Sequence, residues 1–155
     1  MTLYLVLKFL HVTGAAILLG TGIGIAFFLF MADRAGDPRG LAATLRIVVF
    51  ADYLFTATAA LAQPVTGLLL ADLGGYPLGQ TWLEASIGLY LVVGVCWLPV
   101  VVLQIRMRDL AIAAAAANQP LPPAYHRLRR AWFWLGWPAF LALLAIFWLM
   151  LAKPV

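Results

Sequence analysis

Residues 81–105 read TWLEASIGLYLVVGVCWLPVVVLQI, and this stretch decides the fold of the chain. Its only charged residue is Glu84, and a helix that crosses a bilayer needs about 20 mostly apolar residues. Lipid cannot satisfy a free backbone N–H or C=O group, so a spanning segment of a single chain forms a helix or joins a closed barrel. Barrel strands alternate apolar and polar residues, whereas this stretch is continuously apolar. It therefore predicts a membrane-spanning helix.

Three similar apolar segments accompany it, and polar breaks rich in Gly and Pro separate them. We predict spans at about residues 3–32, 41–71, 81–105 and 131–152. The run from Ala111 to Ala117 predicts that the third helix continues beyond the membrane, because Ala is the best helix former. The predicted fold is an all-α, antiparallel four-helix transmembrane bundle, in a single membrane domain covering residues 1–155.

The amino-acid composition excludes a soluble globular domain and a disordered chain. The chain is 65% hydrophobic and 10% charged, whereas soluble domains carry about a quarter charged residues. A globule of 155 residues cannot hide so much apolar surface, so neither a soluble domain nor a disordered chain fits. Cys96 is the single cysteine, so no internal disulfide is possible. The first segment lacks a basic start and a clear cleavage site, and we expect it to be a retained span rather than a signal peptide.

The basic residues predict the orientation of the bundle. The net charge is +4, and all eight arginines lie in or beside the first and third breaks, at positions 34, 39, 46, 106, 108, 127, 129 and 130. These breaks fall on one side of a four-span chain, and the positive-inside rule makes that side cytoplasmic. Both termini would then face outward. The positive charge is explained by topology, so we expect no nucleic-acid partner.

Several polar side chains are expected to converge in the outer half of the bundle. Each of the four spans brings at least one polar side chain to this half. The candidate site residues are Lys8, His11, Gln63, Glu84 and Lys153. Ionisable groups inside a membrane span are costly and are therefore candidates for function. One hypothesis is that His11 is an axial ligand to haem iron, because a buried neutral imidazole is a good ligand. The alternative is that the polar cluster only holds the helices together.

Two other ionisable residues lie away from this cluster. His126 is expected at the cytoplasmic edge, about 30 Å from the outer half, so it cannot share an iron with His11 and fits a lipid headgroup contact. A second ligand could be Lys8, Lys153, a water molecule or a group from another subunit. Asp52 lies deep in the second span, where it could form a buried pair or hydrogen bond, or relay a proton. Its role stays open at this stage.

Small residues at four-residue spacing mark one face of the first span. Ala16, Gly20 and Gly24 would let another helix approach closely in lipid. They indicate either tight packing within the bundle or a homodimer face. The four methionines are scattered, which disfavours a thioether copper relay. There is also no P-loop, dinucleotide fingerprint or zinc-binding helix motif.

Several motifs resemble domain-of-unknown-function family 2269, predicted bacterial integral membrane proteins. They are YLVLKFLH at 4–11, GTG at 20–22, MADR at 31–34, WLP at 97–99, QIRMR at 104–108, PPAYHR at 122–127 and GWP at 136–138. The resemblance covers essentially the whole chain. It implies a four-span protein of the bacterial inner (plasma) membrane, and no established activity.

A more distant resemblance concerns the two ends of the chain. Lys8-x-Leu10-His11 is similar to the opening of HemJ-type protoporphyrinogen oxidases, and Lys153-Pro154 is similar to their C-terminal end. That family binds b-type haem, so the resemblance implies haem b at His11, with the two lysines as site residues. The HemJ-type pattern has an Asn-Glu pair before the last-span proline, and this chain has none before Pro138. The same superfamily includes CopD-type copper-resistance membrane proteins.

The functional prediction follows from these observations. We expect an integral inner-membrane protein that binds b-type haem through His11, for a redox role in haem biosynthesis or electron transfer. The alternative is a non-catalytic membrane subunit or small transporter, including one for copper. Whether the protein is an enzyme stays undecided at this stage.

Overall fold

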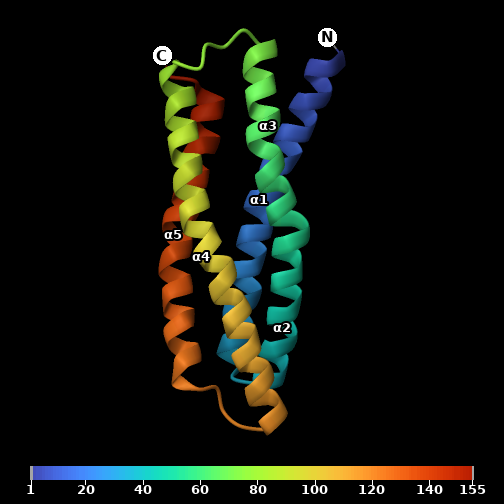
Figure 1. Ribbon diagram of the computed structural model, residues 1–155, viewed down its shortest axis with the longest axis vertical. Coiled ribbons are helices and arrows are strands. Elements are labelled where there is room, and N and C mark those ends of the chain that lie inside the picture. Colours follow the sequence, from blue (N-terminus) through green and yellow to red (C-terminus); the bar gives the residue numbers. More distant parts are fainter. Residues whose placement is uncertain (1, 155) are drawn as a thin grey trace.

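The computed structural model describes residues 2–154 and consists of four long helical rods. The first is α1, Thr2–Ala35. The second joins α2 (Pro38–Ala51), the π-helix η1 (Asp52–Ala57) and α3 (Thr58–Leu73). The third is α4, Thr81–Ala117, and the fourth is α5, Pro123–Ala152. Figure 1 shows that successive rods run in opposite directions, so that both described ends of the chain lie at one end of the bundle.

Each rod is long and apolar enough to cross a membrane. The best windows of the four rods have mean hydropathies of 2.2, 1.6, 2.3 and 2.1. The predicted all-α bundle with four membrane helices is therefore confirmed for residues 2–154. The helices are longer than the apolar spans: α1 continues to Ala35 and α5 begins at Pro123. Arg and Ala are good helix formers, so the helices continue through basic turns beyond the apolar region.

Local signals explain where the rods end. The carboxylate of Asp37 accepts hydrogen bonds from the backbone N–H groups of Arg39 and Gly40, at 3.0 and 2.9 Å. These bonds cap the start of α2, and they lower the pKa of Asp37. Gly36 has a φ of +71°, which suits a residue without a Cβ atom. The first break is therefore a tight turn of two residues between α1 and α2.

The second rod is not a regular α-helix. Residues Asp52–Ala57 form a π-helix in its middle, which the sequence reasoning did not predict. π-Helices are rare and lie frequently at functional sites. The wider turn places Asp52 and Thr56 among the buried residues of the bundle.

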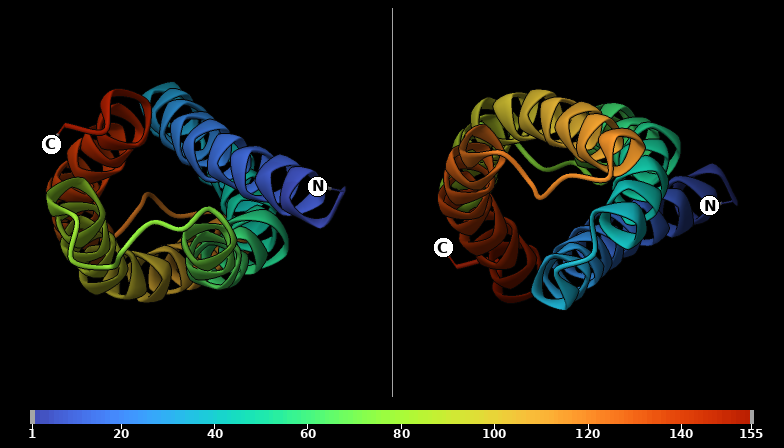
Figure 2. Two further views of the ribbon diagram at one scale, coloured as in Figure 1. Left: turned by 90° about the horizontal axis from the view of Figure 1, so that it is seen from above. Right: turned by 90° about the horizontal axis from the view of Figure 1, so that it is seen from below.

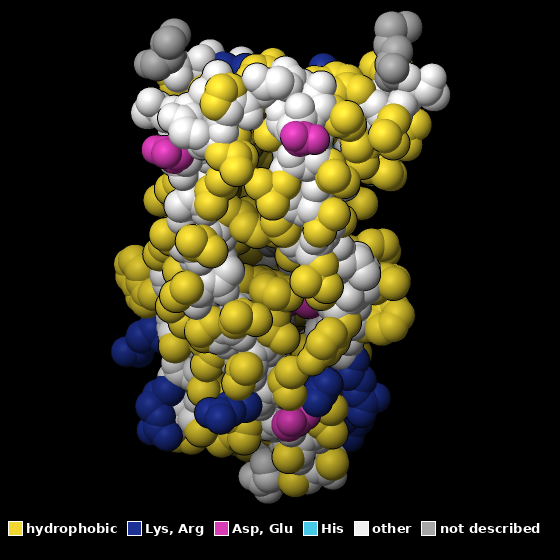
Figure 3. All heavy atoms as spheres, turned by 45° about the horizontal axis from the view of Figure 1, so that its top comes forward, with side chains coloured by type: hydrophobic (Ala, Val, Ile, Leu, Met, Phe, Trp, Pro, Cys, Tyr) yellow, Lys and Arg dark blue, Asp and Glu magenta, His cyan; other side chains and the backbone are white. Residues whose placement is uncertain are grey.

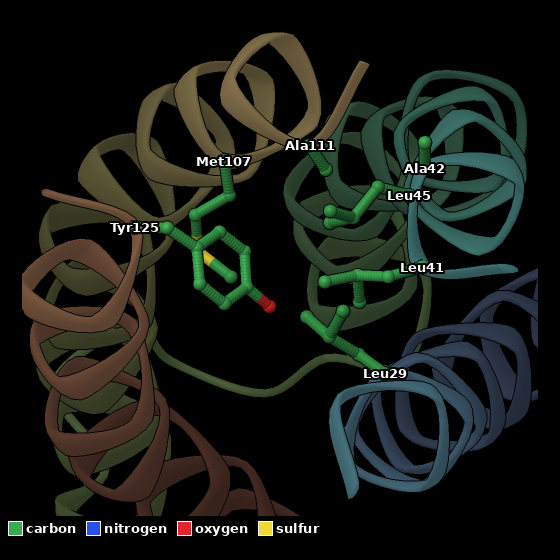
Figure 4. Packing of buried hydrophobic residues seen from close by; sticks show 7 residues of the cluster. All are labelled: Leu29, Leu41, Ala42, Leu45, Met107, Ala111 and Tyr125. Carbon is green, nitrogen blue, oxygen red and sulfur yellow. The ribbon is translucent and has the colours of Figure 1, made fainter. Parts of the chain in front are cut away.

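Two buried clusters lie near opposite ends. The larger one joins α1, α2, α4 and α5, and Figure 4 shows its members facing one another: Leu29, Leu41, Ala42, Leu45, Met107, Ala111 and Tyr125. The smaller one contains Ala71, Trp82 and Leu83. Most other large apolar side chains point outward, as expected for helices whose outer faces are solvated by lipid.

The two ends of the bundle differ in charge. Figure 3 shows Lys and Arg side chains gathered over one end, with an apolar band between it and the other. We call the end with the turns at residues 36–37 and 118–122 the arginine end. The opposite end, with residues 2 and 154 and the turn at residues 74–80, is the terminal end.

The rods do not all pack together to the same extent. The end views of Figure 2 show the four rods arranged around a common axis. α5 packs mainly on α4, α4 also packs on α2, and α1 packs mainly on α3 and α2. Direct contact between α1 and α5 is small. The pair formed by α1 and the second rod therefore positions the groups around His11.

Candidate functional site

The orientation of the His11 ring is fixed by a threonine on α3. Nδ1 of His11 lies 2.8 Å from Oγ1 of Thr66. The hydroxyl of Thr66 also lies 2.8 Å from the backbone carbonyl oxygen of Ala62, which can only accept. A hydroxyl has one proton, so Thr66 donates it to Ala62 and accepts the Nδ1–H of His11. In the neutral ring this leaves Nε2 unprotonated, with a free lone pair.

A second hydrogen bond holds the backbone of α1 at the same position. Nε2 of Gln63 donates to the carbonyl oxygen of His11 at 2.8 Å. Gln63 and Thr66 are each 8% exposed, so both bonds lie away from lipid. The structure thus brings together two of the predicted residues, His11 and Gln63, and adds Thr66.

Two glycines allow α1 and α3 to approach closely here. A Cβ atom on Gly67 would lie 3.1 Å from Cε1 of His11. A Cβ atom on Gly14 would collide with the side-chain amide of Gln63. Glycines at these two positions therefore make room for the polar side chains of the opposite helix.

Lys153 belongs to a different group at the terminal end. Its Nζ donates a hydrogen bond of 2.9 Å to the hydroxyl of Tyr76 and lies 4.3 Å from the centre of that ring. Nζ also lies 5.5 Å from the centre of the Trp82 ring. The hydrogen bond from Lys153, followed by its positive charge, lowers the pKa of Tyr76. This contact ties the end of α5 to the turn between α3 and α4.

The remaining two candidates, Lys8 and Glu84, are exposed at the same end. The charge of Lys8 contributes to the lowered pKa of Tyr76, and Glu84 lies near the turn residue Gly79. Among residues 2–154, no hydrogen bond or ion pair links Lys8, Glu84 or Lys153 to His11. Of the five candidates, His11 and Gln63 are therefore joined by a hydrogen bond, and Lys8, Glu84 and Lys153 lie at the terminal end with no such link to them.

Sequence reasoning missed a polar group at the arginine end. The hydroxyl of Tyr125 donates to Oδ1 of Asp33 at 3.0 Å, and Nη1 of Arg129 lies 3.2 Å from Oδ2. Tyr125 is fully buried. A cleft of about 520 Å³ adjoins this group, and both His126 and Arg39 line it. The only sequence signal was the neighbouring pair Tyr125 and His126 in the first turn of α5. This pair could have indicated a contact that fixes the start of the last helix to the bundle.

Asp52 lies in a third polar group, near the middle of the bundle. It is 4% exposed, and the side chains of Thr56, Trp97 and Gln104 surround its carboxyl group. Among the described residues Asp52 has no ion-pair partner. The buried ion pair considered from the sequence is therefore not present within residues 2–154.

Residue chemistry limits the kinds of metal site that fit. Within residues 2–154, no group of three or more His, Cys, Asp or Glu side chains could hold a metal ion. A haem needs only one protein nitrogen as an axial ligand because the porphyrin supplies four others. Nε2 of His11, left free by the hydrogen bond at Nδ1, is a candidate for such a nitrogen.

The fold and the apolar outer surface define an integral membrane protein with four membrane-spanning helices. The chain belongs to the DUF2269 family of predicted integral membrane proteins, whose model matches residues 5–154. The resemblance to family 2269 seen in the sequence is thus confirmed. No curated protein and no solved structure matches the chain. The more distant similarity to HemJ-type and CopD-type proteins stays a prediction.

Proposed function

We propose that this membrane protein binds a b-type haem through Nε2 of His11, in a redox role related to electron transfer or haem biosynthesis. The observation that carries the proposal is the hydrogen bond between His11 and Thr66. It holds the proton on Nδ1 and leaves Nε2 able to bind iron. The distant resemblance of Lys8-x-Leu10-His11 to haem-binding membrane proteins supports the same role.

The residues around His11 have distinct tasks in this proposal. A bound b-type haem supplies reversible one-electron transfer at its iron. Thr66 accepts the Nδ1–H bond, which orients the ring and makes Nε2 more basic. Gln63 fixes the backbone of α1 at the ligand. Lys8 and Lys153, at the same end, offer positive charge for the haem propionates.

The location of the site is part of the proposal. With a rise of about 1.5 Å per residue, His11 lies about 14 Å along α1 from Thr2. A hydrocarbon layer of about 30 Å, centred on the helix, would place His11 just inside one boundary. The positive-inside rule supports a cytoplasmic arginine end. Both termini would then face the outer or periplasmic side of a bacterial inner membrane.

The test is an absorption spectrum of the full-length protein, purified after expression with an adequate haem supply. We expect a Soret band that shifts on reduction with dithionite and that His11→Ala removes. His126→Ala is the matched control, because His126 lies at the arginine end, and it should leave the band unchanged. A protein without the band, or a band that His11→Ala leaves intact, would contradict the proposal.

A homodimer through the face formed by Ala16, Gly20 and Gly24 belongs to the same proposal. Ala16 and Gly20 are exposed, and a Cβ atom on Gly20 would meet nothing within 4 Å. The face is therefore not used for packing at Gly20 within one chain, and small residues favour close helix association in lipid. Gly20→Leu should abolish a cross-linked dimer, and an unchanged dimer would contradict this part.

A second candidate function is a non-catalytic membrane subunit or a small transporter, including one that handles copper. The observation that favours it is that both hydrogen bonds at His11 join α1 to α3, which is what a purely structural cluster would do. In this case His11→Ala would lower the stability of the protein, and the wild type would show no Soret band. Bound copper in the purified wild type would single out the copper-handling form.

A further inference from the structure

Four polar side chains lie together where the π-helix in the middle of the second rod faces α4. η1 supplies Asp52 and Thr56, and α4 supplies Trp97 and Gln104. Asp52, Thr56 and Gln104 are buried, with exposed fractions of 4%, 8% and 1%. Thr56, Trp97 and Gln104 all lie beside the Asp52 carboxyl group. We call these four residues the Asp52 group.

Thr56, Trp97 and Gln104 lie close enough to act on the Asp52 carboxyl group as hydrogen-bond donors, yet four polar atoms of the group make no hydrogen bond of good geometry within the described residues. They are Oδ2 of Asp52, Oγ1 of Thr56, Oε1 of Gln104 and Nε1 of Trp97. A buried polar atom without a partner is costly, and a buried charge without one costs far more. Three of these four atoms are oxygens, and two helical rods supply them. Oxygen atoms are the ligands that hard cations prefer.

No other charged side chain faces the group from the elements packed around it. The spans 12–32 of α1, 58–71 of α3 and 131–152 of α5 contain no Asp, Glu, Lys or Arg. The nearest basic residues along α2 and α4 are Arg46 and Arg106, and both are exposed. The other titratable side chains near the group in sequence are Tyr53, which is exposed, and Cys96. The carboxylate of Asp52 therefore has no countercharge from residues 2–154.

We propose that the Asp52 group is a binding site for a small monovalent cation, either a sodium ion or a proton carried by water. One positive charge neutralises the single carboxylate, whereas a divalent ion would leave an uncompensated charge in the membrane interior. Oxygens of Asp52, Thr56 and Gln104 contact the cation, and the Trp97 N–H donates to the carboxylate. An irregular turn inside a membrane helix is also a recurrent way to hold a coupling ion.

The position of the group fits this role. Asp52 lies 14 residues beyond Pro38, which corresponds to about 21 Å along the helix from the arginine end. A hydrocarbon layer centred on the rods would place it near the midplane, where secondary transporters hold their coupling ions. The site shares no residue with the group around His11, so this proposal does not depend on haem binding.

The test is the binding of radioactive sodium to the purified full-length protein, at constant ionic strength and several pH values. We expect saturable binding that Asp52→Asn abolishes. Thr56→Val and Gln104→Leu, which each remove one oxygen ligand, should weaken binding about tenfold. Asp72→Asn is the matched control, because it removes an exposed carboxylate at the end of α3 and should have no effect.

The proton is distinguished from sodium in the same samples. If the site prefers a proton, sodium binding is absent, but the pH curve of thermal stability differs between the wild type and Asp52→Asn. The proposal is overturned if the wild type binds no sodium and its stability follows the same pH curve as Asp52→Asn. Should Asp52→Asn fail to fold, unchanged sodium binding and an unchanged pH curve in both Thr56→Val and Gln104→Leu would overturn it equally.

Discussion

The substitution Thr66→Val removes the hydroxyl that accepts the Nδ1–H of His11, at a distance of 2.8 Å. Valine keeps the branched shape of threonine, so no cavity forms. In membrane proteins, one interhelical hydrogen bond contributes about 0.6 to 1.7 kcal/mol. The imidazole N–H, left half-buried without a partner, costs about 1 kcal/mol more. We therefore expect Thr66→Val to lower the free energy of unfolding by about 1.5 to 3 kcal/mol.

The matched control is Thr58→Val on the same helix. The hydroxyl of Thr58 is exposed and contacts only the carbonyl oxygens of Leu54 and Phe55, within its own rod. Its loss should cost less than about 0.5 kcal/mol. The assay is equilibrium unfolding in mixed micelles of a mild detergent and dodecyl sulfate. If Thr66→Val costs no more than Thr58→Val, the bond between Thr66 and His11 does not hold α1 on α3, and the reasoning about the ring orientation fails.

Further predictions concern two of the glycines of α1, a buried tyrosine and a capping aspartate. Gly14→Ala should destabilise the bundle by about 1 to 3 kcal/mol in the same assay, because its Cβ displaces a buried amide, whereas Gly22→Ala meets nothing within 4 Å and should not. Tyr125→Phe should cost about 1.5 to 3 kcal/mol, because it removes a hydrogen bond to a carboxylate, while Tyr53→Phe on the exposed surface should be neutral. The pKa of Asp37 is lowered in the folded protein, so its stabilising effect holds above the ordinary aspartate pKa and is lost as the pH falls below it. Thermal unfolding between pH 2 and 6 should show a smaller loss of stability in Asp37→Asn than in the wild type.

Most of the fold could be predicted because hydrophobicity in a membrane protein is a direct measure of which segments span. The run at residues 81–105 needs a helix wherever it lies in lipid, and the turn residues around Gly36 and Asp37 end the first rod. The ends of the helices were harder to predict. Arg127 and its neighbours favour a helix whether they lie inside or outside the membrane, so the end of the apolar segment does not mark the end of the helix. The π-helix could not be predicted, since nothing in the sequence of residues 52–57 distinguishes it from an α-helix.

The site was partly predictable for a similar reason. Polar residues in apolar spans are few, so His11 and Gln63 stood out, and the order of the helices placed them at one end. Their actual partners depend on how the rods are rotated about their axes. Rotation depends on small residues such as Gly14 and Gly67, whose role is visible only when the opposite side chain is known.

The most direct test of the central claim is chemical rescue of the ligand. His11→Gly removes the imidazole, and free imidazole can enter the space that the ring occupied. We predict that His11→Gly lacks the reducible Soret band of the wild type and that added imidazole restores it, with no such effect in His126→Gly. A Soret band in His11→Gly that matches the wild type before imidazole is added would contradict the assignment of His11 as the iron ligand.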